Sequence, residues 1–237
     1  MKIGVIGAMD IEVSLLKSKM KITSAVTKAG MEFCEGTLFD CDVVVVQSGV
    51  GKVNAAACVQ MLVDLFEVTC VINTGAAGSL DNRIEIGDLV VSSDLIYHDV
   101  NAVIFGYEPG QIPGMKQVSF PADGTLRRMA VNAIKEADPN IGIFEGRIAS
   151  GDSFISTVDK KKEIAEKFGA LCCEMEGAAV AQTCTINGVP FVVVRAISDK
   201  ADGSEGKSYA EFEKKAAEDC ARMVENLIRS FGKMQNE

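Results

Sequence analysis

The stretch FVVVRAISD, residues 191–199, is a run of apolar and β-branched residues that ends in an acid. Five further runs share its apolar character and cover residues 2–7, 43–48, 69–73, 88–93 and 142–149. Strands whose apolar residues are continuous rather than alternating are buried on both faces, which is typical of a sheet with helices on each side. The stretch therefore predicts a strand in the middle layer of an α/β protein.

Helical patterns lie between these runs, at residues 10–20, 52–66, 123–137, 158–168, 175–187 and 208–232. Strands that alternate with helices predict a three-layer α/β/α sandwich with a largely parallel central sheet. The piece MEFCEGTLFDCDVVVV, residues 31–46, alternates in polarity and turns at Asp40, which predicts a hairpin and hence a mixed sheet. Neither a linker nor a repeat divides the sequence, so we expect a single domain over residues 1–237.

The composition limits the partners and the location of the protein. The chain of 237 residues has 24 lysines and arginines against 33 acids, a net charge of -9, and nucleic-acid binding needs a basic face. The apolar runs are too short for a membrane span, and Asp10 and Glu12 interrupt the first one too early for a signal peptide. Eight cysteines, mostly in apolar runs, indicate reduced thiols. We therefore expect a cytoplasmic protein that binds neither nucleic acid nor membrane.

Glycine marks three places where a strand is expected to pass into a helix, at residues 4–12, 48–54 and 73–79. In open α/β sheets ligands bind at the carboxyl ends of the strands, where such turns let the backbone approach closely. Together the three turns favour a ligand crevice. The second turn, SGVGKVN, fits neither the dinucleotide nor the P-loop pattern, because Asn54 replaces a glycine and Val53 replaces Ser or Thr. A nucleotide cofactor therefore loses support.

Carboxylates at strand ends are the remaining candidates for chemistry. The single histidine, His98, and the lack of C-x-x-C and H-E-x-x-H patterns argue against a metal site and against Ser-His-Asp catalysis. Glu12 follows the first run by one turn, and Asp199 ends the last run. Glu174 and Glu176 stand where a short strand is expected to pass into a helix. One such acid is often only a helix cap, but the set predicts a shared crevice.

The motifs GAMDIEV, SGVGKVNAA, NTGAAG, FGYEPGQIPG, SGDSFI, EMEGAAVA and VVVRAISD follow one another over residues 1–212. In order and spacing they resemble the 5′-methylthioadenosine/S-adenosylhomocysteine nucleosidases of the nucleoside phosphorylase superfamily. The resemblance implies a three-layer homodimer of methionine salvage that uses water, without a cofactor, to cleave the N-glycosidic bond of adenine thionucleosides.

The resemblance also implies roles for single residues. Glu12 would activate the attacking water, Glu176 would bind the ribose hydroxyls, and Asp199 would protonate adenine N7. The nucleoside would contact Met9, Val50, Ala77, Gly78, Phe154, Ile155, Met175 and Tyr209, and Arg195 and Ser198 would orient the acids. A loop over residues 99–115 would bring Phe105 and Pro113 into the partner subunit's pocket. The family often has serine where this chain has Ala76, so a hydroxyl near Asp199 is absent or replaced.

These roles suit the chemistry of the reaction. Cleavage of an N-ribosyl bond builds positive charge on the sugar and negative charge on the base, which one acid and one base on opposite faces can stabilise. An aspartic acid with the usual pKa of about 3.9 is ionised at pH 7. We therefore expect a dry pocket in which Asp199 keeps a proton or gains one as the base arrives. The ribose diol offers two donors to the carboxylate of Glu176, whereas Glu174 is expected to be structural.

Three other functions remain open. A nucleoside phosphorylase shares the scaffold but needs cations around phosphate, and the glycine turns offer only Lys52. A hydrolase of another adenine nucleoside, such as aminodeoxyfutalosine, is compatible with the motifs, and so is a preference for 5′-deoxyadenosine. A nucleoside-binding protein without activity is disfavoured, because such a protein has little use for both an acid and a base.

Overall fold

The computed structural model describes residues 1–201 and 209–235, with side chains at these positions except 209–214 and 234–235. Its strands are β1 (Lys2–Gly7), β2 (Lys21–Lys28), β3 (Met31–Leu38), β4 (Cys41–Gln47), β5 (Cys70–Ser79), β6 (Leu89–Tyr97), β7 (Phe120–Pro121), β8 (Ile143–Ser150), β9 (Ala170–Glu174) and β10 (Phe191–Asp199). Its helices are α1 (Asp10–Lys19), α2 (Lys52–Phe66), α3 (Gly124–Ala137), α4 (Val158–Phe168), α5 (Gly177–Asn187) and α6 (Tyr209–Gln235), with a 3-10 turn η1 (Val103–Phe105).

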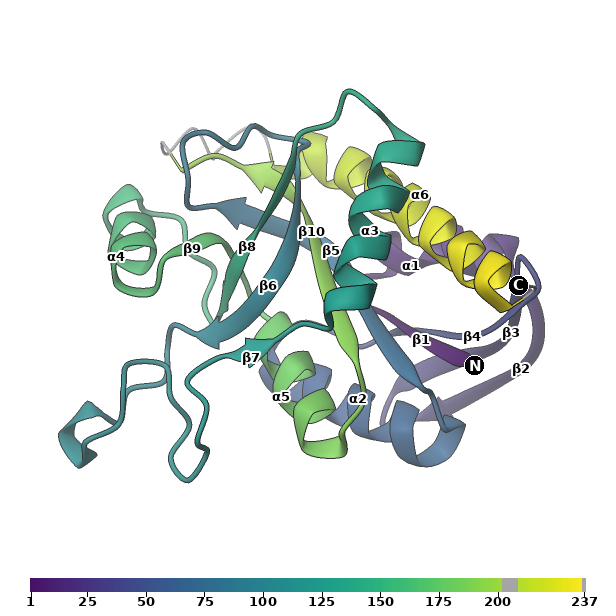
Figure 1. Ribbon diagram of the computed structural model, residues 1–237, viewed down its shortest axis with the longest axis horizontal. Helices are drawn as coiled ribbons and strands as arrows, with labels where there is room; N and C mark the ends of the chain where they lie inside the picture. Colours follow the sequence, from purple (N-terminus) through teal and green to yellow (C-terminus); the bar gives the residue numbers. More distant parts are fainter. Residues whose placement is uncertain (202–208, 236–237) are drawn as a thin grey trace.

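The strands form one mixed sheet in the order β10-β6-β8-β9-β5-β1-β4-β3-β2, and β10 pairs with β5 as well. Five strands, β5, β10, β6, β8 and β9, therefore close on themselves, while β1, β4, β3 and β2 continue from β5 as an open half (Figure 1). The hairpin of β3 and β4 is antiparallel, as predicted. Parallel pairing joins β4, β1, β5 and β10 at the centre, but in the described part of the chain half of the ten strand pairings are antiparallel, more than expected.

Helices cover both faces of the sheet, which confirms the three layers (Figure 1). On one face α1, α3 and α6 enclose a core that includes Val13, Ala130 and Leu227. On the other face α2 and α5 pack through residues such as Leu62 and Val180. Every residue of β10 is buried, as its unbroken apolar pattern predicts. A third cluster lies under α4, beside β8 and β9.

Two expected boundaries are wrong, and both matter for the site. The stretch NTGAAG does not lead into a helix, because residues 73–79 are the second half of the long strand β5, which pairs with β10 and β9. Helix α5 begins at Gly177 rather than at 175, so Met175 and Glu176 belong to the turn that follows β9. Small residues at both places let strand and turn backbone come close to neighbouring side chains.

The sequence patterns do not show β2, whose residues are mostly exposed and polar. It is an edge strand that pairs with β3 alone in the described sheet. All eight cysteines are buried free thiols. Within the described residues, no helix has both the length and the apolar character needed to cross a membrane.

Candidate active site

A cavity that is open to solvent at its mouth lies where β1, β5, β9 and β10 end. Glu12, Glu176 and Asp199, which the sequence places in three separate regions, all line it. All three are nearly inaccessible to solvent. The three acids therefore share one crevice, as the sequence predicts.

Glu12 lies in the first turn of α1, directly after the turn that ends β1. One carboxylate oxygen accepts hydrogen bonds from the backbone N–H groups of Ala8 (2.7 Å) and Met9 (2.9 Å), and the other accepts one from Ala76 of β5 (3.1 Å). Burial raises the pKa of Glu12, although the Arg195 guanidinium and these N–H groups oppose the rise. A fixed carboxylate with a raised pKa is suited to take a proton from water near neutral pH.

Glu176 lies in the turn between β9 and α5, where the backbone N–H of Gly51 donates to its Oε1 at 2.9 Å. Its Oε2 lies 3.7 Å from the Arg195 Nη2. Burial and the neighbouring Glu174 carboxylate raise the pKa of Glu176 to about 7, against the opposing effect of Arg195. This environment therefore holds the acid close to the midpoint of its titration at neutral pH.

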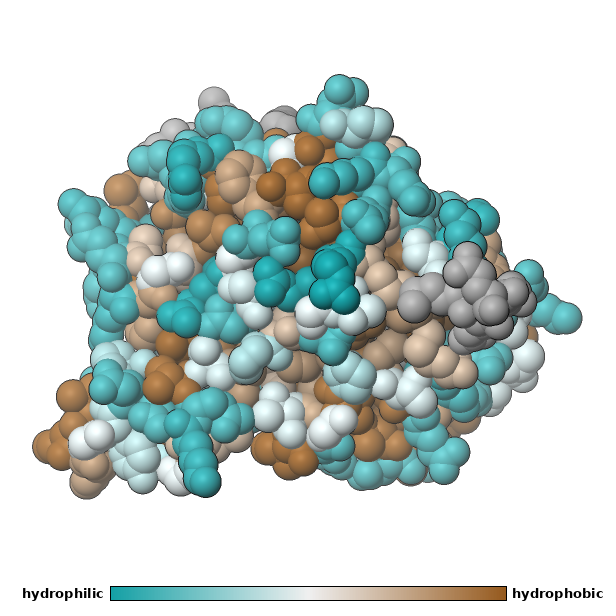
Figure 2. Space-filling model, viewed as in Figure 1, coloured by the Kyte–Doolittle hydropathy of each residue, from teal (hydrophilic) through white to brown (hydrophobic). Residues whose placement is uncertain are grey.

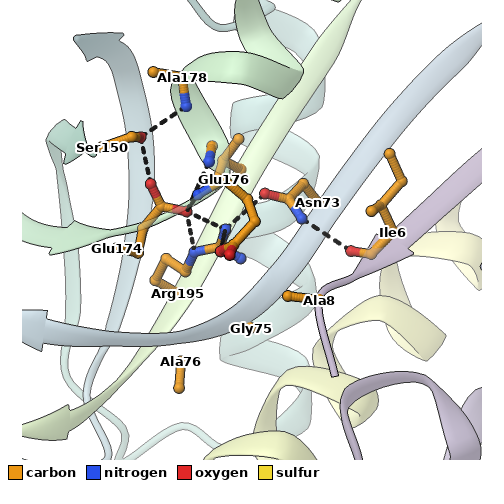
Figure 3. A network of polar contacts seen from close by, with 12 residues as sticks. Ile6, Ala8, Asn73, Gly75, Ala76, Ser150, Glu174, Glu176, Ala178 and Arg195 are labelled. Atoms are coloured by element: carbon orange, nitrogen blue, oxygen red, sulfur yellow. Dashed lines mark hydrogen bonds and ion pairs between the residues drawn. The ribbon is translucent and has the colours of Figure 1, made fainter. Parts of the chain in front are cut away.

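A buried polar network around Arg195 adjoins the cavity and includes Glu174 and Glu176 (Figure 3). The Arg195 guanidinium of β10 binds the Glu174 carboxylate through Nε (3.1 Å) and Nη2, and Nη2 also donates to Asn73 Oδ1 at 2.7 Å. Glu174 in turn accepts the backbone N–H of Gly177 at 2.7 Å and the hydroxyl of Ser150. The carboxylate thus lies at the N-terminus of α5, where a negative charge is favourable, and Glu174 also lines the cavity.

Asp199 ends β10 just after an irregularity in the pairing of β10 with β5. The Ser198 hydroxyl donates to its Oδ1 at 3.0 Å, and the Lys161 ammonium lies 2.7 Å from its Oδ2. Bulged strand ends often re-aim side chains at active sites. A Cβ on Gly78, the residue paired with Asp199, would lie 2.8 Å from Oδ2, so only glycine leaves the carboxyl room.

Most of the residues expected at the site line the cavity. They are Met9, Glu12, Val50, Ala77, Gly78, Phe154, Met175, Glu176, Ser198 and Asp199. Arg195 is buried behind the wall and contacts Glu174 and Glu176 rather than the cavity. Ile155 packs instead against the cluster under α4. Tyr209 begins α6, but its side chain and residues 202–208 lie outside the described residues.

Phe105 and Pro113 do not line the cavity of their own subunit; they lie on the segment between β6 and β7, where both are exposed. Ala76 stands where the family often has serine, and its backbone N–H donates to Glu12. The hydroxyl beside Asp199 belongs to Ser198.

Sequence reasoning missed several residues of the site. Ala8 and Cys173 line the cavity, and Lys161 binds Asp199 from behind. Lys161 belongs to a run of three lysines that resembles a solvated helix face. The spacing of Lys161, Ile164 and Phe168 is the signal that places the middle lysine on the buried side of α4.

Comparison with known proteins places this geometry in a family. A family model described as the phosphorylase superfamily matches residues 2–229. A 5′-methylthioadenosine/S-adenosylhomocysteine nucleosidase of Staphylococcus haemolyticus is 43% identical over 228 residues, which cover 96% of this chain and 99% of the relative.

Solved structures agree with the sequence comparison. The nucleosidase of the same description from Neisseria meningitidis, in complex with methylthio-immucillin-A, superposes with a TM-score of 0.92 at 38% identity, over 97% of this chain and 99% of that one. A futalosine hydrolase of Helicobacter pylori superposes with a TM-score of 0.90 at 32% identity, over 97% of each chain. The chain thus belongs to the phosphorylase superfamily, within its 5′-methylthioadenosine/S-adenosylhomocysteine nucleosidases.

Proposed function

We propose that the protein hydrolyses the N-glycosidic bond of 5′-methylthioadenosine and S-adenosylhomocysteine, releasing adenine and a thioribose. The observation that carries this proposal is the meeting of Glu12, Glu176 and Asp199 in one buried cavity. The 43% identity to a nucleosidase of this description over nearly the whole chain supports the choice of substrate. The futalosine hydrolase is less similar, at 32% identity.

In this proposal the three acids divide the reaction between them. Glu12 accepts a proton from water as the water oxygen attacks C1′ of the ribose, and Asp199 passes a proton to adenine N7 as the bond from C1′ to N9 breaks. Glu176 accepts hydrogen bonds from the 2′- and 3′-hydroxyls, and its negative charge stabilises the oxocarbenium-like sugar. The apolar lining from Met9, Val50 and Met175 suits a thioether, whose sulfur and methyl groups are polarizable.

Water rather than phosphate is the proposed nucleophile. The described residues that line the cavity include neither lysine, arginine nor histidine. Lys52, the cation nearest in sequence to the glycine turns, binds Asp99 at 2.6 Å and lies 3.7 Å from Asp152. A phosphate dianion would therefore meet the Glu12 carboxylate without a compensating charge.

The proposal includes a homodimer in which residues 99–115 complete the partner subunit's site. Ile104 and Phe105 are 88% and 79% exposed, and apolar atoms gather at the lower left of Figure 2, where Figure 1 draws this segment projecting from the body. Val50 and Phe154 at the cavity mouth are also exposed. Adjacent exposed apolar side chains mark interaction surfaces. The buried free thiols support a reducing, cytoplasmic location.

Product analysis tests the proposed reaction. The purified protein is incubated with methylthioadenosine, S-adenosylhomocysteine or 5′-deoxyadenosine, with and without inorganic phosphate. We expect adenine and a free sugar at rates that phosphate does not change. Formation of a sugar 1-phosphate, or adenine release only when phosphate is present, would instead establish a phosphorylase.

A further inference from the structure

Lys161 is a buried cation that has no part in the reaction proposed for the three acids. Helix α4 carries three consecutive lysines, of which Lys160 and Lys162 are exposed and pair with glutamates of their own helix. Lys161 is 1% exposed and lies on the face of α4 that also carries Ile164 and Phe168. Burial of a lysine among apolar side chains is unfavourable unless its charge is compensated. The position therefore calls for a specific role.

The contacts of Lys161 lead to the proposed general acid. Its Nζ lies 2.7 Å from Oδ2 of Asp199, which is itself 2% exposed, and it donates to the backbone carbonyl of Lys200 at 2.6 Å. Ser198 binds the other oxygen of the same carboxylate. The ammonium thus reaches Asp199 from α4, and Lys161 is not among the described residues that line the cavity.

This ion pair raises a chemical difficulty for Asp199 acting alone. Both oxygens of the carboxylate accept hydrogen bonds, one from the ammonium and one from the Ser198 hydroxyl, so neither contact has the carboxyl as the donor. The ammonium beside it has three protons. Between two buried groups a proton can pass along such a pair when the acceptor beyond it becomes basic, as the leaving adenine does when its bond to the sugar breaks.

We propose that Lys161 is the positioning residue that holds the proton which Asp199 delivers to adenine N7. This inference rests on the proposed hydrolase function. As the bond from C1′ to N9 breaks, the Lys161 ammonium passes a proton to the Asp199 carboxylate, Asp199 passes a proton to N7, and Lys161 becomes a neutral amine. Glu12 meanwhile gains the proton that water loses. One proton is therefore gained and one lost by the protein in each turnover, and exchange with solvent restores both groups.

Other titratable groups near the pair do not replace Lys161 in this role. Burial raises the pKa of the Cys172 thiol on β9 well above its usual value, so this neighbour stays neutral. Cys173 of the same strand lies in the cluster under α4 and is also buried. The Lys200 ammonium is turned to Glu85, with which it forms an ion pair. Among the described groups that face Asp199, only Lys161 is positively charged and also in direct contact with the carboxylate.

Two substitutions separate proton supply from structural support. Lys161→Arg keeps a buried cation beside Asp199, but a guanidinium does not release its proton in proteins. Lys161→Met keeps much of the volume and removes the charge. The matched controls Lys160→Met and Lys162→Met change exposed lysines of the same run. We expect both Lys161 variants to lose about 100-fold in kcat on methylthioadenosine, within the usual range for general acid–base catalysis, and the controls to stay within about twofold.

A second substrate separates a chemical defect from a damaged site. A p-nitrophenyl riboside has a leaving group that departs without protonation, so the Lys161→Arg variant should retain most of its wild-type rate on it. Equal losses on both substrates, or wild-type rates of Lys161→Arg on methylthioadenosine, would overturn the inference. If Asp199→Asn abolishes adenine release while Lys161→Arg stays fully active, the hydrolase proposal stands and the role of Lys161 is refuted. If the wild-type protein releases no adenine, the proposed function itself fails.

Discussion

At the scale of single residues, the site contains several buried carboxylates around one buried guanidinium. Glu12, Glu174 and Glu176 all lie within the field of Arg195, which binds Glu174 directly. Burial raises the pKa of the two acids that have no direct hydrogen bond to Arg195, Glu12 and Glu176, and the Glu174 carboxylate adds to the rise at Glu176. The titration of these two acids should therefore control both activity and stability.

The pH dependence of catalysis should differ between the free enzyme and its complex. In the empty site the pKa of Glu176 is about 7. Hydrogen bonds from the ribose diol favour its ionised form and lower that pKa. We expect kcat/KM to fall as pH drops below about 7, and kcat to fall only at lower pH. Steady-state rates on methylthioadenosine from pH 5 to 9 measure both, and coincident acid limbs would contradict the assignment.

Stability should show the opposite dependence on pH. Because the folded-state pKa of Glu176 lies above its ordinary value of 4.5, the folded protein holds a proton that the unfolded chain releases between those two pH values. The stabilisation is complete below pH 4.5 and is lost as pH rises through about 7. Glu176→Gln should therefore raise the melting temperature, relative to wild type, more at pH 8 than at pH 5.5. An equal difference at both pH values would show that the acid is not perturbed.

At the scale of elements, the site depends on how closely strand ends approach one another. Gly78 of β5 faces the end of β10, and its lack of a side chain accommodates the Asp199 carboxyl. Gly75 serves Glu12 in the same way, since a Cβ there would lie 2.5 Å from Glu12 Oε1. The second half of β5, which the sequence suggested was a turn, thus leaves room for both acids that we propose as catalytic.

Substitution of one glycine tests this role of β5. Gly78→Ala would place a methyl group 2.8 Å from Asp199 Oδ2 and displace the carboxyl. We expect a 10- to 100-fold loss of kcat, because small misplacements of catalytic groups are costly, with a far smaller change in melting temperature. Gly124→Ala in α3 is the matched control, since the nearest atom to its added Cβ is a side-chain nitrogen at 3.7 Å. Wild-type turnover by Gly78→Ala would show that the close approach is not required.

The elements differ in how far the sequence predicts them. Unbroken apolar runs identify β1, β4 and β10, because burial on both faces leaves a direct trace in residue type. Strand β2 leaves no such trace, since its stability comes from hydrogen bonds to β3 rather than from burial. The acids follow from the family motifs, but the pairing of Lys161 with Asp199 joins residues 38 positions apart on α4 and β10. Such a contact is set by tertiary packing and is hidden within a run of charged residues.

At the scale of the whole molecule, the exposed segment between β6 and β7 is the part through which we propose that activity depends on assembly. Ile104→Ser and Phe105→Ser, made together, should weaken the proposed dimer, because each apolar side chain is worth roughly 1.5–3 kcal/mol when buried. Sedimentation should show dissociation, with a parallel loss of adenine release. Ile22→Ser on the edge strand β2 is the control, and it should leave both unchanged. Full activity from the dissociated variant would refute a site shared between subunits.

The proposed reaction depends on Glu12. This residue is proposed to be the base that activates water, in a cavity that it shares with Asp199 and Glu176. Glu12→Gln keeps the size of the side chain and removes its capacity to accept a proton. The decisive measurement is adenine release by this variant, alongside binding of methylthioadenosine by calorimetry. We predict that the nucleoside still binds and that release slows by at least about 100-fold. Release at the wild-type rate would remove Glu12 from the mechanism and contradict the account.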